Sequence, residues 1–266
     1  MEIELLNASK LFNKAVALKD VSFSLSTGRL SLITGPNGAG KTTLFRIITK
    51  EYLPSKGDVK YGSGINSSEI AFSDENRDVF QYFSPKNYCR LWQLLYPRFD
   101  KNRFMDLIKS KNIPYSGDVS SFSKGRKTWL FNSLSISSNS KIVIMDEPFQ
   151  HLDPVARDEL RNIFKTETEK GRAIIVSTHE ISEFDEITDD IVILCEGNLL
   201  YSGDKVKTFL THRVIPGTDC EDDCQVIGPI VNEKLVVTEK NTGRTPILKE
   251  IVLGYLNGYQ VNSDRI

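Results

Sequence analysis

Short, almost wholly apolar runs recur along this 266-residue chain and are separated by segments of helix length. The clearest runs lie at residues 30–34, 141–146, 173–178 and 191–194. Continuous apolar runs of this length are typical of strands buried on both faces, and the segments between them are long enough for crossover helices. The pattern therefore predicts an α/β fold built on a parallel sheet.

The first 34 residues have a different, alternating pattern. Apolar and polar residues alternate through 18–25, and a Thr27-Gly28 turn precedes the run at 30–34. Alternation indicates strands with one buried and one solvated face, so we expect short antiparallel strands that form a flap over the parallel core. Residues 56–62 and 69–73 add two further strand candidates.

Residues from about 79 to 138 follow neither pattern. Aromatic residues become dense, the alternation disappears, and Pro85, Pro97 and Pro114 separate segments of helix length. These features predict a mainly helical subdomain inserted into the core.

The end of the chain differs again. After about residue 211, Pro216-Gly217 and an acidic run mark a loop, followed by a strand at 235–237 and a terminal helix from 246 to 256. We therefore expect a main domain over residues 1–210 and a C-terminal extension over 211–266.

A glycine-rich segment follows the first buried strand. It fits the spacing G-x-x-x-x-G-K-T and precedes an apolar-periodic stretch; its residues are Gly35, Pro36, Asn37, Gly38, Ala39, Gly40, Lys41 and Thr42. Because glycine adopts positive φ angles freely, consecutive N–H groups can turn inward around phosphates, and the next helix adds the positive end of its dipole. Lys41 would reach the β- and γ-phosphates, and Thr42 would offer its hydroxyl to Mg²⁺. A chance glycine turn is the alternative, but the flanking strand and helix match the context that the motif requires.

Two carboxylates and a histidine follow two other buried strands. Asp146 and Glu147 end the run at 141–146, and His179 follows the run at 173–178. Parallel strands present their carboxyl ends at the ligand-binding edge of a sheet, so these side chains should lie near the phosphate loop. We expect Asp146 to hold Mg²⁺ through water, Glu147 to polarise the attacking water, and His179 to sense the γ-phosphate and orient Glu147. A carboxylate pair that only caps its strand, and a structural histidine, are the alternatives.

Charge and composition exclude several classes of function. The 34 Lys and Arg residues nearly balance the 35 Asp and Glu residues, which argues against a broad nucleic-acid surface or a polybasic membrane anchor. The apolar runs are too short for a membrane span, and the acidic N-terminus does not resemble a secretory signal, so we expect a cytosolic chain. Cys89, Cys195, Cys220 and Cys224 are scattered, which favours reduced thiols over a metal site.

Five ordered motifs resemble those of the nucleotide-binding subunit of ABC (ATP-binding cassette) transporters. In chain order they are GPNGAGKT at 35–42, FSKGR at 122–126, IVIMDEP at 142–148, HLDP at 151–154 and STHE at 177–180. The resemblance covers about residues 3–210. Residues 95–100 and 246–256 are also similar to subunits of exporter-type (ABC-2) systems.

The resemblance implies a P-loop NTPase fold, with a RecA-like parallel sheet, an antiparallel β flap and the inserted helical subdomain. It also implies ATP and Mg²⁺ as ligands, with ATP held by the segment from Gly35 to Thr43. Phe12 occupies the place where the family stacks an aromatic ring on adenine, although a core phenylalanine is an equal alternative.

The family works as a pair, so the resemblance implies a second ABC subunit, identical or closely related. Ser123, Lys124 and Gly125 of one chain would complete the ATP site of the other. Asp153 would lie in the loop that crosses between the subunits. A separate integral membrane permease would hold the pair at the inner face of the cell membrane, and some aromatic residues of the helical insert would line a groove for it.

Two positions depart from the family pattern. Glu75 stands where a glutamine usually contacts Mg²⁺ and the attacking water, and its carboxylate would still bind Mg²⁺ while adding negative charge near the triphosphate. Lys124 replaces a usual glycine. Together with Arg126, Lys124 places cations at a helix N-terminus, where the dipole disfavours them until an anion arrives. These charges are expected to make subunit closure more dependent on bound ATP.

We therefore expect an ATP-hydrolysing subunit that powers export through a permease and does not bind nucleic acid. A non-transport ABC ATPase acting on DNA or ribosomes is one alternative. A nucleotide-gated binding module with little hydrolysis is the other, because Glu75 and Lys124 alter the site.

Overall fold

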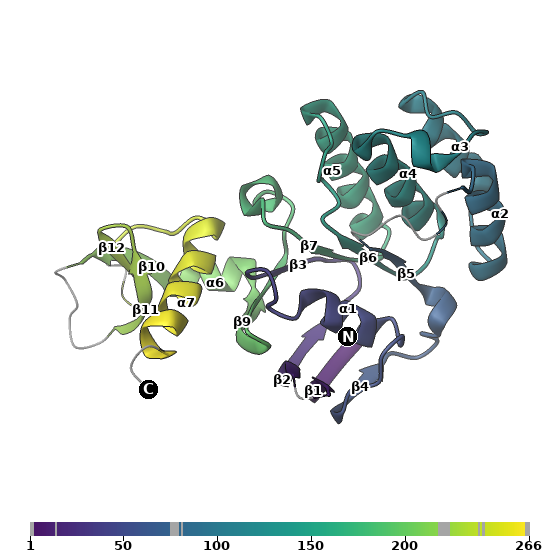
Figure 1. Cartoon of the computed structure of the whole chain (residues 1–266). Helices are drawn as coiled ribbons and strands as arrows, with labels where there is room; N and C mark the ends of the chain where they lie inside the picture. Colours follow the sequence, from purple (N-terminus) through teal and green to yellow (C-terminus); the bar gives the residue numbers. More distant parts are fainter. Residues whose placement is uncertain are drawn as a thin grey trace.

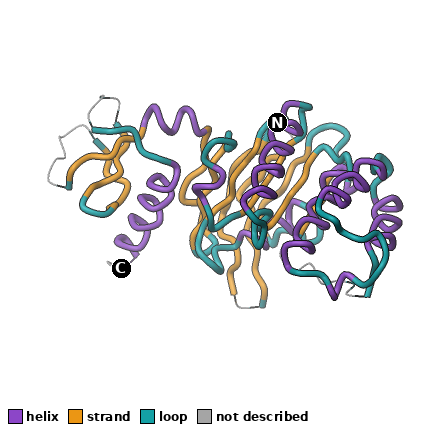
Figure 2. Tube along the Cα trace, turned by 90° about the horizontal axis from the view of Figure 1, so that it is seen from above, coloured by secondary structure: helices purple, strands orange, loops and turns teal. Residues whose placement is uncertain are grey.

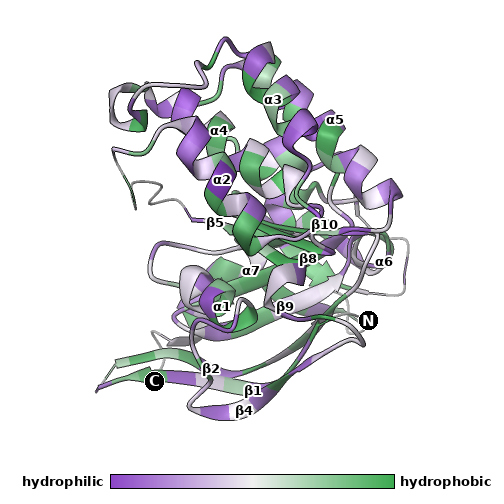
Figure 3. Cartoon of the chain, turned by 90° about the vertical axis from the view of Figure 1, so that its right-hand side faces the viewer, coloured by the Kyte–Doolittle hydropathy of each residue, from purple (hydrophilic) through white to green (hydrophobic). Residues whose placement is uncertain are grey.

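The computed structural model describes residues 3–13, 15–74, 80, 82–217, 224–238, 240 and 243–263. Seen from above, a large sheet occupies the centre, with a cluster of helices on one side and a smaller unit on the other (Figure 2). Hydrophobic residues gather in the central strands, and polar residues colour much of the outer surface of the helices (Figure 3). This arrangement confirms the predicted P-loop NTPase class, with its parallel core, β flap and helical insert.

In the described part of the chain, the central sheet has nine strands in the order β4-β1-β2-β9-β8-β3-β7-β6-β5. Its parallel part consists of β3 (Leu30–Thr34), β5 (Ile70–Ser73), β6 (Ile142–Asp146), β7 (Ala173–Ser177) and β8 (Asp190–Cys195). All five residues of β3, β6 and β7 are buried, as their apolar sequences predict. The central position of β3, between β7 and β8, places the glycine-rich segment in the middle of the sheet edge.

The antiparallel flap consists of β1 (Ile3–Phe12), β2 (Ala15–Leu25) and β4 (Lys56–Tyr61), and β9 (Asn198–Asp204) joins it to the parallel part. The expectation of short strands was wrong here, because β1 and β2 are 10 and 11 residues long. Their pairing shifts register at three points, and Asn7 and Asp20 have positive φ angles. Each bulge interrupts the alternation of apolar and polar residues, so long strands look short in the sequence.

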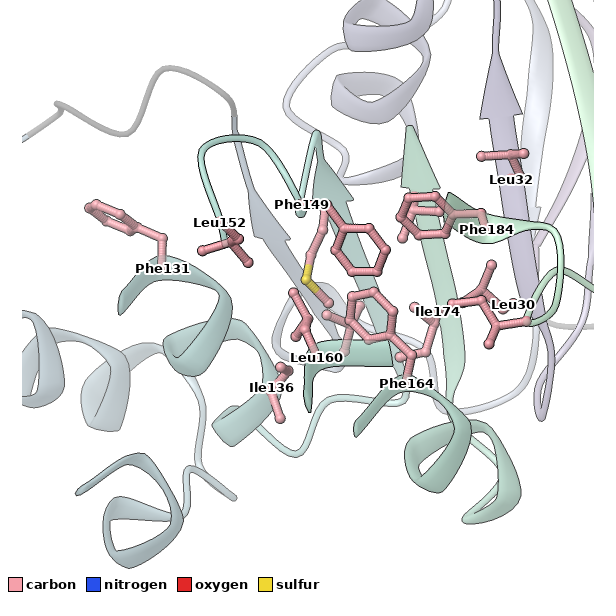
Figure 4. Packing of buried hydrophobic residues seen from close by; sticks show 14 of the residues in the cluster. Leu30, Leu32, Phe131, Ile136, Phe149, Leu152, Leu160, Phe164, Ile174 and Phe184 are labelled. Carbon is pink, nitrogen blue, oxygen red and sulfur yellow. The ribbon is translucent and has the colours of Figure 1, made fainter. Parts of the chain in front are cut away.

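Helices cover both faces of the sheet. Helix α1 (Lys41–Ile48) packs on one face with the flap, while α4 (Lys124–Ser137) and α5 (Pro154–Glu169) pack on the other. On the second face, the rings of Phe149, Phe164 and Phe184 lie together (Figure 4), and Phe149 stacks on Phe184 with a centroid distance of 4.3 Å. This aromatic stack anchors the segment that follows β6.

The helical insert contains α2 (Pro85–Leu95), α3 (Lys101–Ser110) and α4, together with the short η2 (Val119–Ser121). Tyr88, Phe104 and Trp129 are buried between these helices, so part of the aromatic density forms the insert's own core. Two other short 3-10 helices, η1 (Ser67–Glu69) and η3 (Ile181–Phe184), precede β5 and β8.

The C-terminal unit is a second, three-stranded sheet in the order β10-β12-β11, covered by a helix. It comprises α6 (Lys205–Thr211), β10 (His212–Pro216), β11 (Gln225–Ile230), β12 (Glu233–Val237) and α7 (Leu248–Ser263). Strands β10 and β11 have no counterpart in the sequence prediction, which placed only a strand at 235–237 and a terminal helix here. The unit lies to one side of the main sheet (Figure 1), yet Val214, Leu235 and Ile251 belong to the same buried apolar cluster as the main domain.

Candidate active site

The carboxyl ends of three neighbouring strands meet around one cavity. The glycine-rich loop follows β3, Asp146 ends β6 and is followed by Glu147, and His179 lies just after β7. The cavity has a volume of about 210 Å³ and is lined by Ala17, Asn37, Gly38, Ala39, Gly40, Lys41, Thr42, Thr43, Asp146, Glu147 and His179. The side chains predicted to bind phosphate, hold Mg²⁺ and activate water therefore share one hollow.

Two glycines of the loop are required by space as well as by conformation. Gly35 has a φ of 151°, and a Cβ atom there would lie 2.0 Å from the carbonyl oxygen of Leu194. Gly40 has a φ of 102°, and its Cβ would lie 2.6 Å from the carbonyl oxygen of Ala17. Any side chain at either position would push the loop away from the strands behind it.

The ammonium of Lys41 lies inside the loop. Its Nζ donates to the carbonyl oxygens of Gly35 at 2.8 Å and Pro36 at 3.1 Å, and the residue is buried. Helix α1 begins at Lys41, and its first bond runs from the N–H of Leu44 to the carbonyl of Gly40. The N–H groups of the first turn come before that first bond and therefore have no acceptor within the helix. Together with the Lys41 ammonium they present positive charge to the cavity, as a phosphate site requires.

Asp146 and Thr42 provide the oxygen atoms that suit Mg²⁺. The Thr42 hydroxyl donates to Oδ2 of Asp146 at 3.1 Å, and the Ser177 hydroxyl donates to Oδ1 of the same carboxylate. Among the described residues, no three His, Cys, Asp or Glu side chains are grouped as a protein-only metal cage would require. One hydroxyl and one carboxylate fit an ion such as Mg²⁺ that takes its remaining ligands from phosphate and water.

Glu147 is held at the cavity by the strand next to its own. Its N–H donates to the carbonyl of Ser177 at 3.1 Å, its backbone has a φ of 50°, and the residue is buried. The Thr178 hydroxyl donates to Oε2 at 3.2 Å, and Nε2 of His179 lies 3.5 Å from Oε1. This geometry suits a carboxylate that polarises water, with the half-exposed His179 at the open side.

Ser177 and Thr178 are site residues that the sequence analysis missed. Ser177 binds the Asp146 carboxylate, and Thr178 binds Glu147 while it also accepts from the N–H of Glu180. Both lie in the motif that contains His179, and a hydroxyl at the end of a buried strand was the available signal. Their role is to fix the orientation of both carboxylates.

Three of the residues predicted to act between subunits, Ser123, Gly125 and Asp153, line a different hollow, whereas Lys124, the first residue of α4, is not in its lining. Ser123 accepts from the N–H of Arg126 at the start of α4, and Asp153 accepts from the N–H of Ala156 at the start of α5. They line a cavity of about 390 Å³ with Lys111, Gly125, Arg126, Trp129, His151, Leu152 and Ala156, none of which lines the cavity at the phosphate loop. A Cβ at Gly125 would lie 2.6 Å from the carbonyl oxygen of His151, so the start of α4 packs closely against the segment that precedes α5.

Comparison with known proteins decides the family. A family model described as ABC transporter matches residues 18–150, which is half of the chain. The chain belongs to the ABC transporter family. This ABC chain is thereby confirmed as an ATP-binding and ATP-hydrolysing subunit, and the direction of transport stays a prediction.

Relatives agree with this membership, and a solved structure shares the fold. The energy-coupling factor transporter ATP-binding protein EcfA3 of Oenococcus oeni is 26% identical over 238 residues, which cover 79% of this chain and 81% of that protein. The uncharacterized ABC transporter ATP-binding protein YhcH of Bacillus subtilis is 29% identical over 210 residues, with coverages of 74% and 68%. The structure of an ATP-binding subunit of an ABC transporter superposes with a TM-score of 0.70 at 23% identity, covering 78% of this chain and 91% of that one.

Four predicted ligands of the ABC site are not among the residues that line the cavity. Gly35 and Pro36 accept from Lys41 through their carbonyl oxygens, and the other two are Phe12 and Glu75. The ring of Phe12 is 39% exposed, and its edge packs against Tyr52 at a centroid distance of 5.3 Å with Lys10 beside it. Glu75 lies outside the described residues. The roles of both residues stay predictions.

Proposed function

We propose that this ABC subunit couples ATP-driven closure of a subunit pair to export through a separate membrane permease. One observation carries the proposal: Lys41, Asp146, Glu147 and His179, from three adjacent strand ends, line one cavity at the glycine-rich loop. If each of these four side chains had only a structural role in its own strand, there would be no reason for all four to line the same cavity.

Each residue has a role that follows from its position. The loop from Gly35 to Thr43 cradles the phosphates, and Lys41 turns its ammonium from the loop carbonyls toward them. Thr42 and Asp146 hold Mg²⁺, which when bound neutralises charge on the phosphates. Glu147 accepts a proton from the attacking water, and His179 holds that carboxylate in place through its 3.5 Å contact.

The second hollow supports a site shared between two chains. Ser123 and Gly125 begin one helix and Asp153 begins another, and both helix starts present N–H donors away from their own phosphate loop. A second subunit in head-to-tail orientation, identical or closely related, would bring these donors to the ATP of its partner.

A membrane permease is the partner that transport requires. Within the part of the chain that the structure describes, no helix combines the length and the apolar character of a membrane span. The helical insert exposes large apolar side chains, with Tyr82 80% and Leu94 83% exposed, and these support a docking surface for a permease segment. Attachment there would hold the subunit at the inner face of the membrane.

The direction of transport rests on the similarity of residues 95–100 and 246–256 to exporter-type subunits. The names of relatives do not decide it, since they include a ribose import ATP-binding protein of Rhizobium johnstonii and the human glucosylceramide transporter ABCA12. Transport of substrate into inverted membrane vesicles that contain the purified complex would support export, and uptake in the opposite orientation would refute it.

Phosphate release tests the enzymatic role. Replacing Glu147 with glutamine is expected to slow release at least about 100-fold, the usual contribution of a positioned base. Glu180→Gln is the matched control, because Glu180 is a nearby carboxylate that pairs with Arg157 outside the cavity. Wild-type release no faster than that of Glu147→Gln would favour a nucleotide-gated module over an ATPase.

A further inference from the structure

The tight turn between β8 and β9 lies directly behind the phosphate loop. Its residues are Glu196, Gly197 and Asn198, and the N–H of Gly197 donates to the carbonyl of Ala39 at 3.1 Å. On its other side, the carbonyl of Gly197 accepts from the N–H of Lys19 at 2.8 Å. The turn therefore connects the loop to the flap through main-chain bonds.

There is little free space between these segments. Gly197 has a φ of 79°, and a Cβ there would lie 2.9 Å from the carbonyl oxygen of Ala17. The same oxygen lies 2.6 Å from a Cβ built at Gly40. Ala17 also lines the cavity, so a displacement of the turn has to move Ala17, Ala39 or both.

Helix α7 of the C-terminal unit holds the turn from outside. The hydroxyl of Tyr259 accepts from Nδ2 of Asn198 at 2.9 Å and donates to Oε2 of Glu196 at 3.3 Å. One phenol thus uses both its donor and its acceptor on the two residues that flank Gly197. Partial burial and the neighbouring Glu196 raise the pKa of Tyr259 above its ordinary value.

Helix α7 in turn packs so closely on the small sheet that the two backbones are in contact. A Cβ at Gly228 of β11 would lie 2.1 Å from the carbonyl oxygen of Gly254, and one at Gly258 would lie 1.9 Å from that of Ile227. Nδ2 of Asn257 also donates to the carbonyl of Pro229 at 2.8 Å. Because no side chain separates helix and strand here, α7 and the small sheet have to move together.

We propose that Tyr259 is a positioning residue through which the C-terminal unit sets the geometry of the phosphate loop. The connection runs from the small sheet to α7, from Tyr259 to the β8–β9 turn, and from Gly197 to Ala39. A protein or ligand that shifts the C-terminal unit therefore changes the affinity for nucleotide. The inference rests on the proposed role of Gly35–Thr43 in binding ATP.

The test compares nucleotide affinity in two variants of the full chain. Tyr259→Phe removes the hydroxyl and both of its bonds to the turn. The two bonds act on the loop only indirectly, so the Kd for MgATP measured by calorimetry is expected to rise about three- to tenfold, the range of a single hydrogen bond. Tyr255→Phe is the matched control, because it removes a hydroxyl one turn earlier that binds Nε2 of His212 at 2.9 Å and does not touch the turn. Its Kd is expected to stay at the wild-type value.

Hydrogen exchange supplies a second measurement. It distinguishes a local loosening of the turn from a general loss of stability, which would speed exchange throughout the chain. In Tyr259→Phe the amides of Gly197, Gly35 and residues 37–41 are expected to exchange faster, while the β6 amides are unchanged. Asn198→Ala should also speed exchange, because it removes the bond to Tyr259 together with the amide's bonds to the carbonyls of Cys195 and Glu196. Since the two variants share the Asn198–Tyr259 bond, the double variant should change exchange by less than the sum of the single changes.

Three outcomes distinguish the positioning role of Tyr259 from the role of the phosphate loop in binding ATP. Unchanged affinity and exchange in Tyr259→Phe would refute the positioning role, as would an equal loss of affinity in Tyr255→Phe. The phosphate-loop assignment has its own control in Lys41→Ala, which should abolish MgATP binding. Retained binding in Lys41→Ala would refute the proposed function, whereas lost binding there with no effect of Tyr259→Phe would refute only the positioning role.

Discussion

Replacing Glu167 with glutamine should destabilise this protein more than any change on its surface. Glu167 lies near the end of α5, is 1% exposed, and accepts hydrogen bonds from three cations. Arg103 donates at 2.7 Å and Lys170 at 2.9 Å, and Arg172 completes the group. Arg103 belongs to the helical insert, whereas Arg172 directly precedes β7, so one carboxylate joins the insert to the core.

The magnitude follows from the pKa of this carboxyl. Burial alone would raise the pKa of Glu167, but the hydrogen bonds from Arg103, Lys170 and Arg172 outweigh it and lower the pKa from 4.5 to about 2. A difference of that size corresponds to about 3 kcal/mol of folding free energy at neutral pH. Loss of one partner from a buried charge group has a similar cost, because the remaining charges are left uncompensated.

The pH dependence of this contribution has a definite sign. A carboxyl whose pKa is lower in the folded state stabilises that state fully above its unfolded pKa, near 4.5. The contribution is then lost as the pH falls from 4.5 toward 2. The difference in unfolding free energy between wild type and Glu167→Gln should therefore be constant from pH 7.5 to about 5 and shrink below that.

Urea-induced unfolding followed by circular dichroism at each pH measures both quantities. Glu169→Gln is the matched control, since Glu169 is two residues further along the same helix and is exposed. Its unfolding free energy should differ from wild type by no more than about 0.5 kcal/mol. A loss in Glu167→Gln as small as in the control, or one that does not shrink in acid, would refute the reasoning.

Three further predictions concern the site. Gly125→Ala is expected to lower ATPase activity about tenfold and leave the folded structure largely intact, because the new methyl group would meet the carbonyl of His151 and displace the crossing loop. Steady-state phosphate release measures the activity and a thermal melt measures the stability. Full activity would contradict the prediction. Lys124→Gly should allow pairing at lower ATP concentration, as measured by light scattering, and unchanged ATP-driven dimerisation would refute the effect of charge. Thr178→Val removes the hydroxyl that binds Glu147, and it should reduce kcat several-fold while the Kd for ATP stays the same.

The parallel core and the phosphate loop could be predicted from the sequence because their signals are local. Each buried strand is a continuous apolar run, and the glycine spacing of the loop reflects φ angles that few other residues adopt. Asp146, Glu147 and His179 could be placed at one edge because they follow such runs, and the parallel topology then brings them together.

The contacts that hold this site could not be predicted in the same way. Strand β9 lies between β2 and β8, although β2 and β9 share a single paired position, Lys19 with Asn198. No local pattern encodes such a pairing, and the same holds for β10 and β12, which pair although β11 lies between them in the chain. Long-range pairing depends on the packing of the whole domain.

The same reason separates motif residues from positioning residues in this protein. Tyr259 and Glu167 each act through partners far away in the sequence, 61 residues from Asn198 in one case and 64 from Arg103 in the other. A tyrosine or a glutamate on a helix has no distinctive sequence signal, since its importance comes entirely from what the fold places beside it. Variants at these two positions should therefore separate the two functions of the fold: Glu167→Gln should change stability with wild-type affinity for ATP in the folded fraction, and Tyr259→Phe should change affinity with nearly wild-type stability. If both variants changed both quantities equally, the phosphate loop and the ion group would belong to one cooperative unit, and the proposed connection through the β8–β9 turn would lose its specificity.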